Sequence, residues 1–269
     1  MIQIQHATFR YPGQPETALC DVSLEVASAE TIGIVGPNGS GKSTLGRLIK
    51  GLLLPSLGRI LVDSLDTGAD GLEVRRRVGL VFQNPNSQIV NSVVEQEVAF
   101  GPENLGLPSA EIRERVDSAL QAVGLQHRKT AECHALSMAD KQRVAIAAVM
   151  AMHPRHLVLD EPTAWIEPSA RWPLFNEVRR WSSSREVTLV LITHRMDEAQ
   201  LCGRLYGMLH GKVEIAGTPD EVLQNQEACA RLALEVPETL LLARELGAAG
   251  LPVDGAGGVD RMAEAICRS

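Results

Sequence analysis

The sequence lacks any apolar run that approaches the ~20 residues needed to cross a bilayer. Its first ten residues, MIQIQHATFR, lack the basic and apolar regions of a signal peptide. Low-complexity tracts are also missing, and 45 % hydrophobic with 22 % charged residues is the composition of an ordinary globular protein. We therefore expect 269 residues to form one large domain with appendages or two modest domains, with any membrane role being peripheral.

Paired cysteines and a surplus of basic residues are lacking as well. The five cysteines are scattered singly, with no C-x-x-C pair, which is typical of a protein from the reducing cytosol. The net charge of -7 argues against a general nucleic-acid binder, which usually carries a basic face. The one basic cluster, residues 75–77, is expected to be a solvated loop or helix face.

Residues 31–44, TIGIVGPNGSGKST, combine a short β-branched run, a glycine-rich turn and the start of a leucine-rich helix. The turn fits the pattern G-x-x-x-x-G-K-[ST], in which backbone N–H groups and a helix N-terminus hold phosphates. A lysine in this pattern reaches the β- and γ-phosphates and the next hydroxyl ligates Mg²⁺. The sequence predicts a site for ATP or GTP with Mg²⁺, formed by Gly36, Asn38, Gly39, Ser40, Gly41, Lys42, Ser43 and Thr44.

Two further apolar runs end in polar side chains. HLVLDEP ends in Asp160 and Glu161, and VTLVLITH ends in His194. Because the carboxyl ends of parallel strands face the ligand crevice, these residues are expected near the phosphates. Asp160 is predicted to hold the Mg²⁺ shell, Glu161 to polarise an attacking water and His194 to contact the γ-phosphate. The alternatives are a solvated turn before Pro162 and a structural histidine.

Together these motifs resemble the ATPase subunit of an ABC transporter, in an order that matches the family over nearly the first 220 residues. The resemblance places Tyr11, in FRYPG, where the family stacks an aromatic ring on adenine, with a core or strand aromatic as the alternative. It places Gln83, in VFQNP, in the loop that senses Mg²⁺ and the membrane partner. It implies an α/β P-loop fold with a parallel-sheet core, an antiparallel β subdomain and a helical subdomain.

The stretch VFQNPNSQIVNSVVEQEVAFGPENLGLP is similar to one branch of that family, the energy-coupling factor ATPases, which power uptake of vitamins and of cobalt or nickel ions. Gln88 and the segment EVAFGPENLGLP carry this finer match, and a generic ABC importer subunit is the alternative. The resemblance implies a second ABC ATPase, a transmembrane coupling protein and a substrate-binding membrane component as partners, at the cytoplasmic face of the cell membrane. No nucleic-acid partner is expected.

The resemblance also predicts the domain organisation. Residues 1–218 are expected to form the nucleotide-binding domain, with the helical subdomain at about 84–152 docking on the transmembrane partner. Residues 219–269 are expected to form a C-terminal helical extension, which includes a glycine break at VDGAGGVD. Family analogy makes this extension a dimerisation element, and packing of an amphipathic helix on its own domain is the alternative.

The stretch LSMADKQR departs from the family, which carries LSGGQ there and presses this helix start on the ATP of a partner subunit. Ser137 is retained as a predicted N-cap of a helix running through Met152, but Met138, Ala139 and Asp140 replace the Gly-Gly-Gln. Side chains at the first two positions block close backbone approach, and the carboxylate repels the γ-phosphate. This helix start is therefore predicted to be a poor clamp for ATP.

A second departure follows Pro162, where TAWIEP stands in place of a turn ending in Gly-Leu-Asp-Pro. It puts Trp165 at the glycine and Glu167 at the aspartate, with burial of the tryptophan in its own core as one alternative.

We expect an ATP-hydrolysing, transport-coupling subunit with an asymmetric heterodimer as the productive assembly. The rivals are a nucleotide-gated module that hydrolyses nothing and a soluble ABC-type ATPase outside transport.

Overall fold

A four-stranded antiparallel sheet forms one side of the molecule in the computed structural model, which describes residues 1–236 and 238–248. Its order is β2-β1-β4-β5. Side chains alternate along these strands, so that Leu19, Val22, Leu24 and Val26 are buried whereas Asp21, Ser23 and Glu25 are exposed. The strands are β1 Ile2–Phe9, β2 Leu19–Val26, β4 Leu57–Val62 and β5 Leu65–Asp66.

A six-stranded sheet forms the centre of the molecule, in the order β10-β9-β3-β8-β7-β6. All strands are parallel except β10, which pairs antiparallel with β9. The central strands read as continuous apolar runs because both faces of this sheet are covered. The strands are β3 Thr31–Val35, β6 Val78–Val81, β7 His156–Asp160, β8 Thr188–Ile192, β9 Arg204–Leu209 and β10 Lys212–Gly217.

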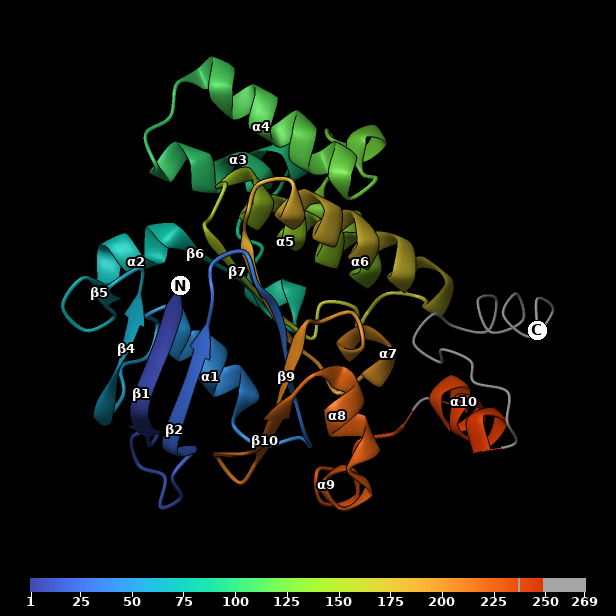
Figure 1. Ribbon diagram of the computed structural model, residues 1–269. Coiled ribbons are helices and arrows are strands. Elements are labelled where there is room, and N and C mark those ends of the chain that lie inside the picture. The colour runs from blue at the N-terminus through green and yellow to red at the C-terminus, as the bar shows by residue number, and fades with distance from the viewer. Residues whose placement is uncertain (237, 249–269) are drawn as a thin grey trace.

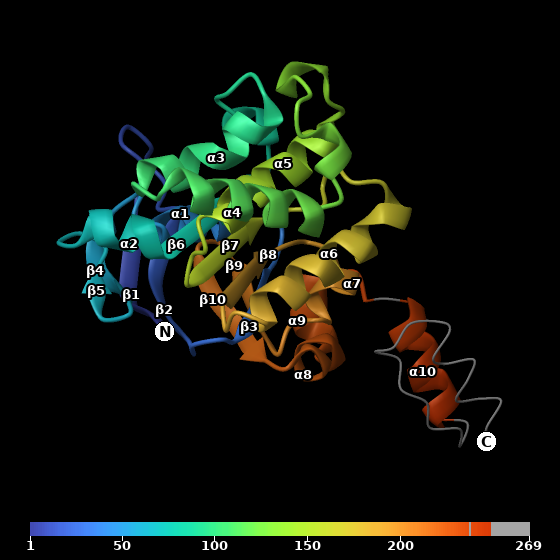
Figure 2. The same cartoon turned by 90° about the horizontal axis from the view of Figure 1, so that it is seen from above.

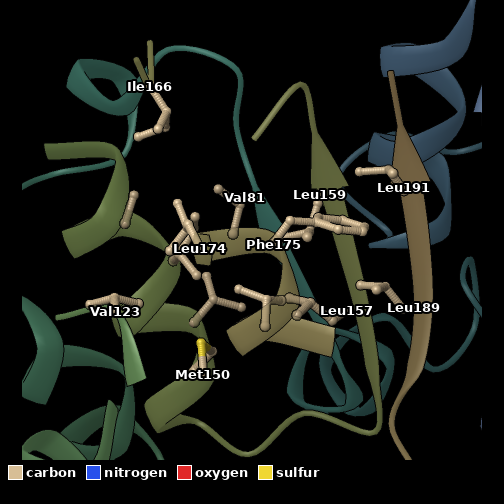
Figure 3. Close-up of a cluster of buried hydrophobic side chains, with 14 of the residues drawn as sticks. Val81, Val123, Met150, Leu157, Leu159, Ile166, Leu174, Phe175, Leu189 and Leu191 are labelled. Atoms are coloured by element: carbon tan, nitrogen blue, oxygen red, sulfur yellow. The ribbon is translucent and has the colours of Figure 1, made fainter. Parts of the chain in front are cut away.

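Two hydrophobic clusters lie on opposite faces of the parallel sheet, because successive side chains of a strand point to opposite faces. Val158 and Val190 join α1 (Lys42–Ile49) and the antiparallel sheet in one cluster. Leu157, Leu159 and Leu191 join α5 (Met138–Ala151) and α6 (Pro168–Ser183) in the other, part of which Figure 3 shows. Helix α1 thus packs between the two sheets, directly behind the phosphate loop.

Helices α3 and α4 pack on α5, on the side away from the parallel sheet (Figure 1). These three helices lie within the segment predicted to be the helical subdomain. The bounds of the helices between α1 and β9 are α2 Gly71–Arg77, α3 Val94–Asn104, α4 Ser109–Ala122, α5 Met138–Ala151, α6 Pro168–Ser183 and α7 Met196–Ala199. The 3₁₀ turns η1 Pro85–Ser87, η2 Gln126–Arg128 and η3 Cys133–Ala135 link them.

The segment after β10 begins with α8 (Pro219–Gln224) and α9 (Gln226–Arg231), which pack on the chain's own domain. Val222, Leu223 and Leu232 are fully buried in the cluster that includes α5 and α6. Helix α10 (Glu238–Ala248) lies at the edge of the molecule in both Figure 1 and Figure 2. The predicted glycine break, VDGAGGVD, lies outside the described residues. In the part of the chain that the structure describes, no helix is long and apolar enough to cross a membrane.

Candidate active site

The phosphate loop connects β3 to α1, and its glycines adopt conformations that other residues rarely take. Gly36, Gly39 and Gly41 have φ angles of +141°, +77° and +100°. A Cβ added at Gly36 would come within 2.2 Å of the Met208 carbonyl oxygen. The loop therefore follows a path that depends on missing side chains, as the sequence pattern predicts.

The ammonium group of Lys42 lies across this loop. Its Nζ donates hydrogen bonds to the carbonyl oxygens of Gly36 and Pro37, both at 2.8 Å. Burial lowers the pKa of Lys42, while Glu161 and Asp160 act in the opposite direction. A buried cation beside a glycine-rich loop and a helix N-terminus is arranged to receive phosphate oxygens.

Ser43 and Asp160 form an oxygen pair beside Lys42. The Ser43 hydroxyl donates to Asp160 Oδ1 at 3.0 Å, and Asp160 is 4 % exposed. Burial raises the pKa of Asp160, partly offset by the Ser43 hydrogen bond. A desolvated carboxylate and a hydroxyl are hard oxygen donors of the kind Mg²⁺ prefers. These side chains, with Gln83 nearby, therefore fit that ion.

Glu161 follows Asp160 at the end of β7 and takes an unusual backbone conformation for a non-glycine residue, with φ of +51°. Its N–H donates to the carbonyl of Ile192 at 2.9 Å, which fixes it against the end of β8. His194, at the end of that neighbouring strand, lies with its Nδ1 2.7 Å from Glu161 Oε1. The carboxylate is buried whereas the imidazole is mostly exposed. This contact joins the ends of two neighbouring strands beside the phosphate loop.

A pocket of about 500 Å³ brings most of the predicted residues together. Its lining adds Ala18, which the sequence reasoning missed, to Tyr11, Asn38, Gly39, Ser40, Gly41, Lys42, Ser43, Thr44, Gln83 and Glu161. Asp160 lines the adjoining pocket of about 360 Å³ together with Ser43 and Gln83. His194 and Gly36 do not line either pocket. They belong to the site because His194 contacts Glu161 and Gly36 accepts a hydrogen bond from Lys42.

Tyr11 lines the pocket and is anchored by its hydroxyl group. Its OH lies 3.1 Å from Thr44 Oγ1 and accepts a hydrogen bond from Arg47 at 3.3 Å. Its ring meets Phe9 edge to face, with centroids 4.9 Å apart. Tyr11 is thus fixed at the rim of the phosphate loop, and the stacking of adenine on it stays a prediction.

A buried network that the sequence reasoning missed joins the loops that follow β7 and β8. Glu198 accepts hydrogen bonds from the hydroxyls of Thr163 and Thr193, the latter at 2.9 Å. Arg195 lies 3.3 Å from the same carboxylate. The network fixes the loop after Glu161 relative to the loop that carries His194. No local motif marks Glu198, because its two hydroxyl partners come from separate loops.

Trp165 is 46 % exposed, so the alternative that it is buried in its own core is wrong. Ile166, the next residue, takes the core position and is 2 % exposed. The Trp165 indole N–H donates to the carbonyl oxygen of Gln83 at 2.8 Å. The departure from the family turn therefore places an aromatic side chain on the loop that carries Gln83.

The start of α5 caps itself as predicted. The Ser137 hydroxyl accepts a hydrogen bond from the Asp140 N–H at 3.1 Å, and α5 ends one residue before its C-cap, Met152. Met138 and Lys141 contact Asn86, through Sδ at 3.4 Å and Nζ at 3.2 Å. This helix start thus packs on the loop that carries Gln83.

The fold and this site define a P-loop ATPase of the ABC type. The chain belongs to the ABC transporter family, whose model, described as "ABC transporter", matches residues 19–164. Within the family it is an ATP-binding subunit of the energy-coupling factor type, as the sequence predicted.

Relatives and solved structures agree with this assignment. The EcfA1 energy-coupling factor ATP-binding protein of Symbiobacterium thermophilum is 48 % identical over 254 residues, 93 % of this chain and 88 % of that protein. Its counterpart from Clostridium perfringens is 42 % identical over 275 residues, 100 % of this chain and 98 % of that protein.

Among solved structures, cbiO1 from Clostridium perfringens, described as part of the ABC transporter complex cbiONQ, has a TM-score of 0.76 at 35 % identity, covering 90 % of this chain and 98 % of its own. The dimeric cassette MJ0796 with ADP and Pi has a TM-score of 0.74 at 26 % identity, covering 81 % of this chain and 99 % of its own. The predicted P-loop ABC fold is confirmed.

Proposed function

We propose that this chain hydrolyses ATP at the site built on Lys42 and Glu161, and that hydrolysis drives a membrane uptake transporter for a vitamin or a transition-metal ion. The observation that carries the proposal is the Glu161–His194 contact of 2.7 Å beside an intact phosphate loop. A site that only bound nucleotide would need the loop but not this pair. The names of the relatives supply the transport context.

The phosphate loop binds and orients the triphosphate. Its backbone N–H groups and the Lys42 ammonium receive the phosphate oxygens, and Tyr11 offers a ring for the base. Ser43, Asp160 and Gln83 would hold Mg²⁺, which supplies positive charge to the phosphate oxygens when bound. Burial lowers the pKa of Lys42, because it disfavours the charged ammonium. A phosphate that binds beside it favours the charged form, and the same attraction strengthens phosphate binding.

Glu161 acts as the general base. A carboxylate that acts as a base can only accept, so the 2.7 Å contact to Oε1 requires the proton on His194 Nδ1. That hydrogen bond fixes the carboxylate and leaves Oε2 to accept the proton of the attacking water. The hydrogen bond from the Glu161 N–H to Ile192 keeps the side chain at the strand end. His194 thereby positions the base and would also contact the transferring phosphoryl group.

The proposal predicts that Glu161→Gln retains ATP binding but loses turnover. Removing a general base costs about 10²–10⁴-fold in rate, while the amide keeps the size of the side chain. ATP affinity and hydrolysis are measured for the chain in the assembled transporter, and Lys42→Ala serves as the matched control because it should lose binding itself. Hydrolysis at the unchanged rate by Glu161→Gln would refute the catalytic assignment.

We further propose that the productive assembly is a heterodimer at the cytoplasmic face of the membrane, with a related ATPase that carries an intact LSGGQ-type helix. Met138, Ala139 and Asp140 occupy the helix start that would meet a partner's phosphates. Two copies of this chain would give two impaired sites, whereas a heterodimer keeps one good site. A transmembrane coupling protein and a substrate-binding membrane component complete the complex in this proposal.

A further inference from the structure

The loops that follow the neighbouring strands β6 and β7 are joined by one side chain, Trp165. Its indole N–H donates to the Gln83 carbonyl at 2.8 Å, a usual distance for a neutral N–H···O hydrogen bond. Within the residues that the structure describes, this is the one side chain bonded to Gln83. The bond fixes the backbone of Gln83, whose side chain lines the pocket with Glu161.

Trp165 is held firmly although its ring is half exposed. The preceding turn is closed by hydrogen bonds from the Ala164 N–H to the Glu161 carbonyl at 3.1 Å and from the Ile166 N–H to the Thr163 carbonyl at 3.0 Å. Arg171 Nε donates to the Ile166 carbonyl at 2.7 Å, and the Ile166 side chain is buried. The indole therefore extends from a rigid turn only four residues after the base.

The rest of the Gln83 loop is held by α5 from another direction. Gln142 Nε2 donates to the Phe82 carbonyl at 3.3 Å, and Lys141 Nζ donates to Asn86 Oδ1 at 3.2 Å. Side chains of α5 therefore bind the loop before and after Gln83, at Phe82 and Asn86, whereas the Gln83 carbonyl is bound by Trp165. Loss of the indole N–H would release Gln83 without releasing its neighbours.

We propose that Trp165 is a positioning residue that sets the direction of the Gln83 side chain toward the reacting phosphates. This inference rests on the proposed function, since it assigns Gln83 a part in turnover. Trp165 does not touch the pocket itself and acts through the Gln83 backbone. Any displacement of the turn after Glu161 is passed to Gln83 through this bond.

Trp165→Phe tests the proposal, because phenylalanine keeps an aromatic ring but removes the donor. We expect kcat to fall about three- to tenfold in the assembled transporter, with ATP affinity changed less than twofold, since one partly exposed hydrogen bond is lost and the phosphate loop is intact. Trp172→Phe is the matched control, because Trp172 is 50 % exposed and lies outside the site. Equal kcat values for Trp165→Phe and Trp172→Phe would overturn the proposal.

A double-mutant cycle separates positioning from a general loss of stability. Gln83→Ala keeps the carbonyl that Trp165 binds but removes the side chain that Trp165 is proposed to direct. We therefore expect Trp165→Phe to have no further effect on kcat in the Gln83→Ala background. The same three- to tenfold loss in both backgrounds would show that Trp165 does not act through Gln83.

The cycle, together with the Glu161→Gln variant, also distinguishes failure of this inference from failure of the proposed function. Turnover that survives Glu161→Gln would refute the proposed base, yet the Trp165–Gln83 coupling could still be measured. Conversely, an additive cycle in an enzyme that needs Glu161 would refute the positioning role alone.

Discussion

At the residue scale, the path of the phosphate loop depends on the absence of a side chain at Gly36. The Met208 carbonyl of β9 lies where a side chain at this position would start. The loop can therefore pass under the strand only where no Cβ exists. The Gly36 carbonyl accepts a hydrogen bond from the Lys42 ammonium, so the path of the backbone also sets the position of the cation.

Gly36→Ala is expected to reduce both stability and ATP binding. The added Cβ would lie 2.2 Å from the Met208 oxygen, and the φ of +141° is strained for alanine, so we expect a loss of about 2 kcal/mol or more in the free energy of unfolding. Urea unfolding and nucleotide titration measure the two effects. Gly39→Ala is the matched control for the clash, since Gly39 also has a positive φ, +77°, but no atom lies within 4 Å of a Cβ there. Equal stability of the two variants would contradict this reading of the loop.

Local patterns predicted the phosphate-loop residues and the carboxylates of the site because each follows an apolar strand directly. Contacts between separate loops could not be predicted in this way. The Trp165–Gln83 bond and the Thr163–Glu198 bond join segments whose distance depends on the sheet order. Tertiary packing also decides the exposure of Trp165, since either Trp165 or Ile166 could occupy the core position.

At the element scale, the start of α5 shows a conflict between capping and phosphate binding. Ser137 caps the helix, and Asp140 at its first turn interacts favourably with the helix dipole. The same carboxylate would repel a partner's ATP. The sequence pattern predicted both the cap and the departure from the family motif, while the contacts of Met138 and Lys141 to Asn86 required the fold.

Replacing Met138, Ala139 and Asp140 by Gly-Gly-Gln is expected to raise the ATPase rate of a homodimer while lowering thermal stability. Each glycine costs roughly 0.5–1 kcal/mol in a helix, and the loss of Asp140 removes its interaction with the dipole. ATPase rate against protein concentration, with and without a partner ATPase, measures the gain. Fast hydrolysis that is cooperative in concentration by the unmodified chain alone would refute the heterodimer proposal.

At the scale of the whole molecule, Asp63 connects the two sheets. It lies in the turn between β4 and β5, and its Oδ1 accepts from the N-terminal ammonium at 2.8 Å and lies 3.0 Å from His156 Nε2 at the start of β7. Burial raises the pKa of Asp63, but the N-terminal ammonium and His156 more than offset this and hold it below its usual value. Burial lowers the pKa of His156, which is 2 % exposed.

These pKa shifts predict that the free energy of unfolding decreases in two stages as the pH is lowered. The unfolded His156 gains a proton near pH 6.5 before the folded one does, so stability falls below that pH by at most about 1.4 kcal/mol per pH unit. The stability from Asp63 is present above pH 3.8 and is lost as pH falls through its lower folded pKa. Urea unfolding between pH 7 and pH 5 should show a smaller slope for His156→Gln. Equal slopes would contradict the prediction.

Apolar runs predicted the central strands that carry the site, and the family resemblance implied the second sheet and the helical subdomain, but the position of the final segment could not be predicted. Val222 of α8 and Leu232, the C-cap of α9, are buried in the main core. Helix α10 exposes Leu241 and Leu242. The role of residues 219–269 in dimerisation stays a prediction, because short amphipathic helices carry no signal for the surface that they cover.

The place of β3 between β8 and β9 has a consequence for the order of events during synthesis. Thr31 pairs with Leu189 and Ile32 with Arg204, so the strand that carries the phosphate loop gains both neighbours only after most of the chain has left the ribosome. The family match ends at residue 164, before either neighbour begins. A nascent chain therefore carries the complete nucleotide motif for many seconds without a formed site, and ATP can stabilise the protein only in the last stage of folding.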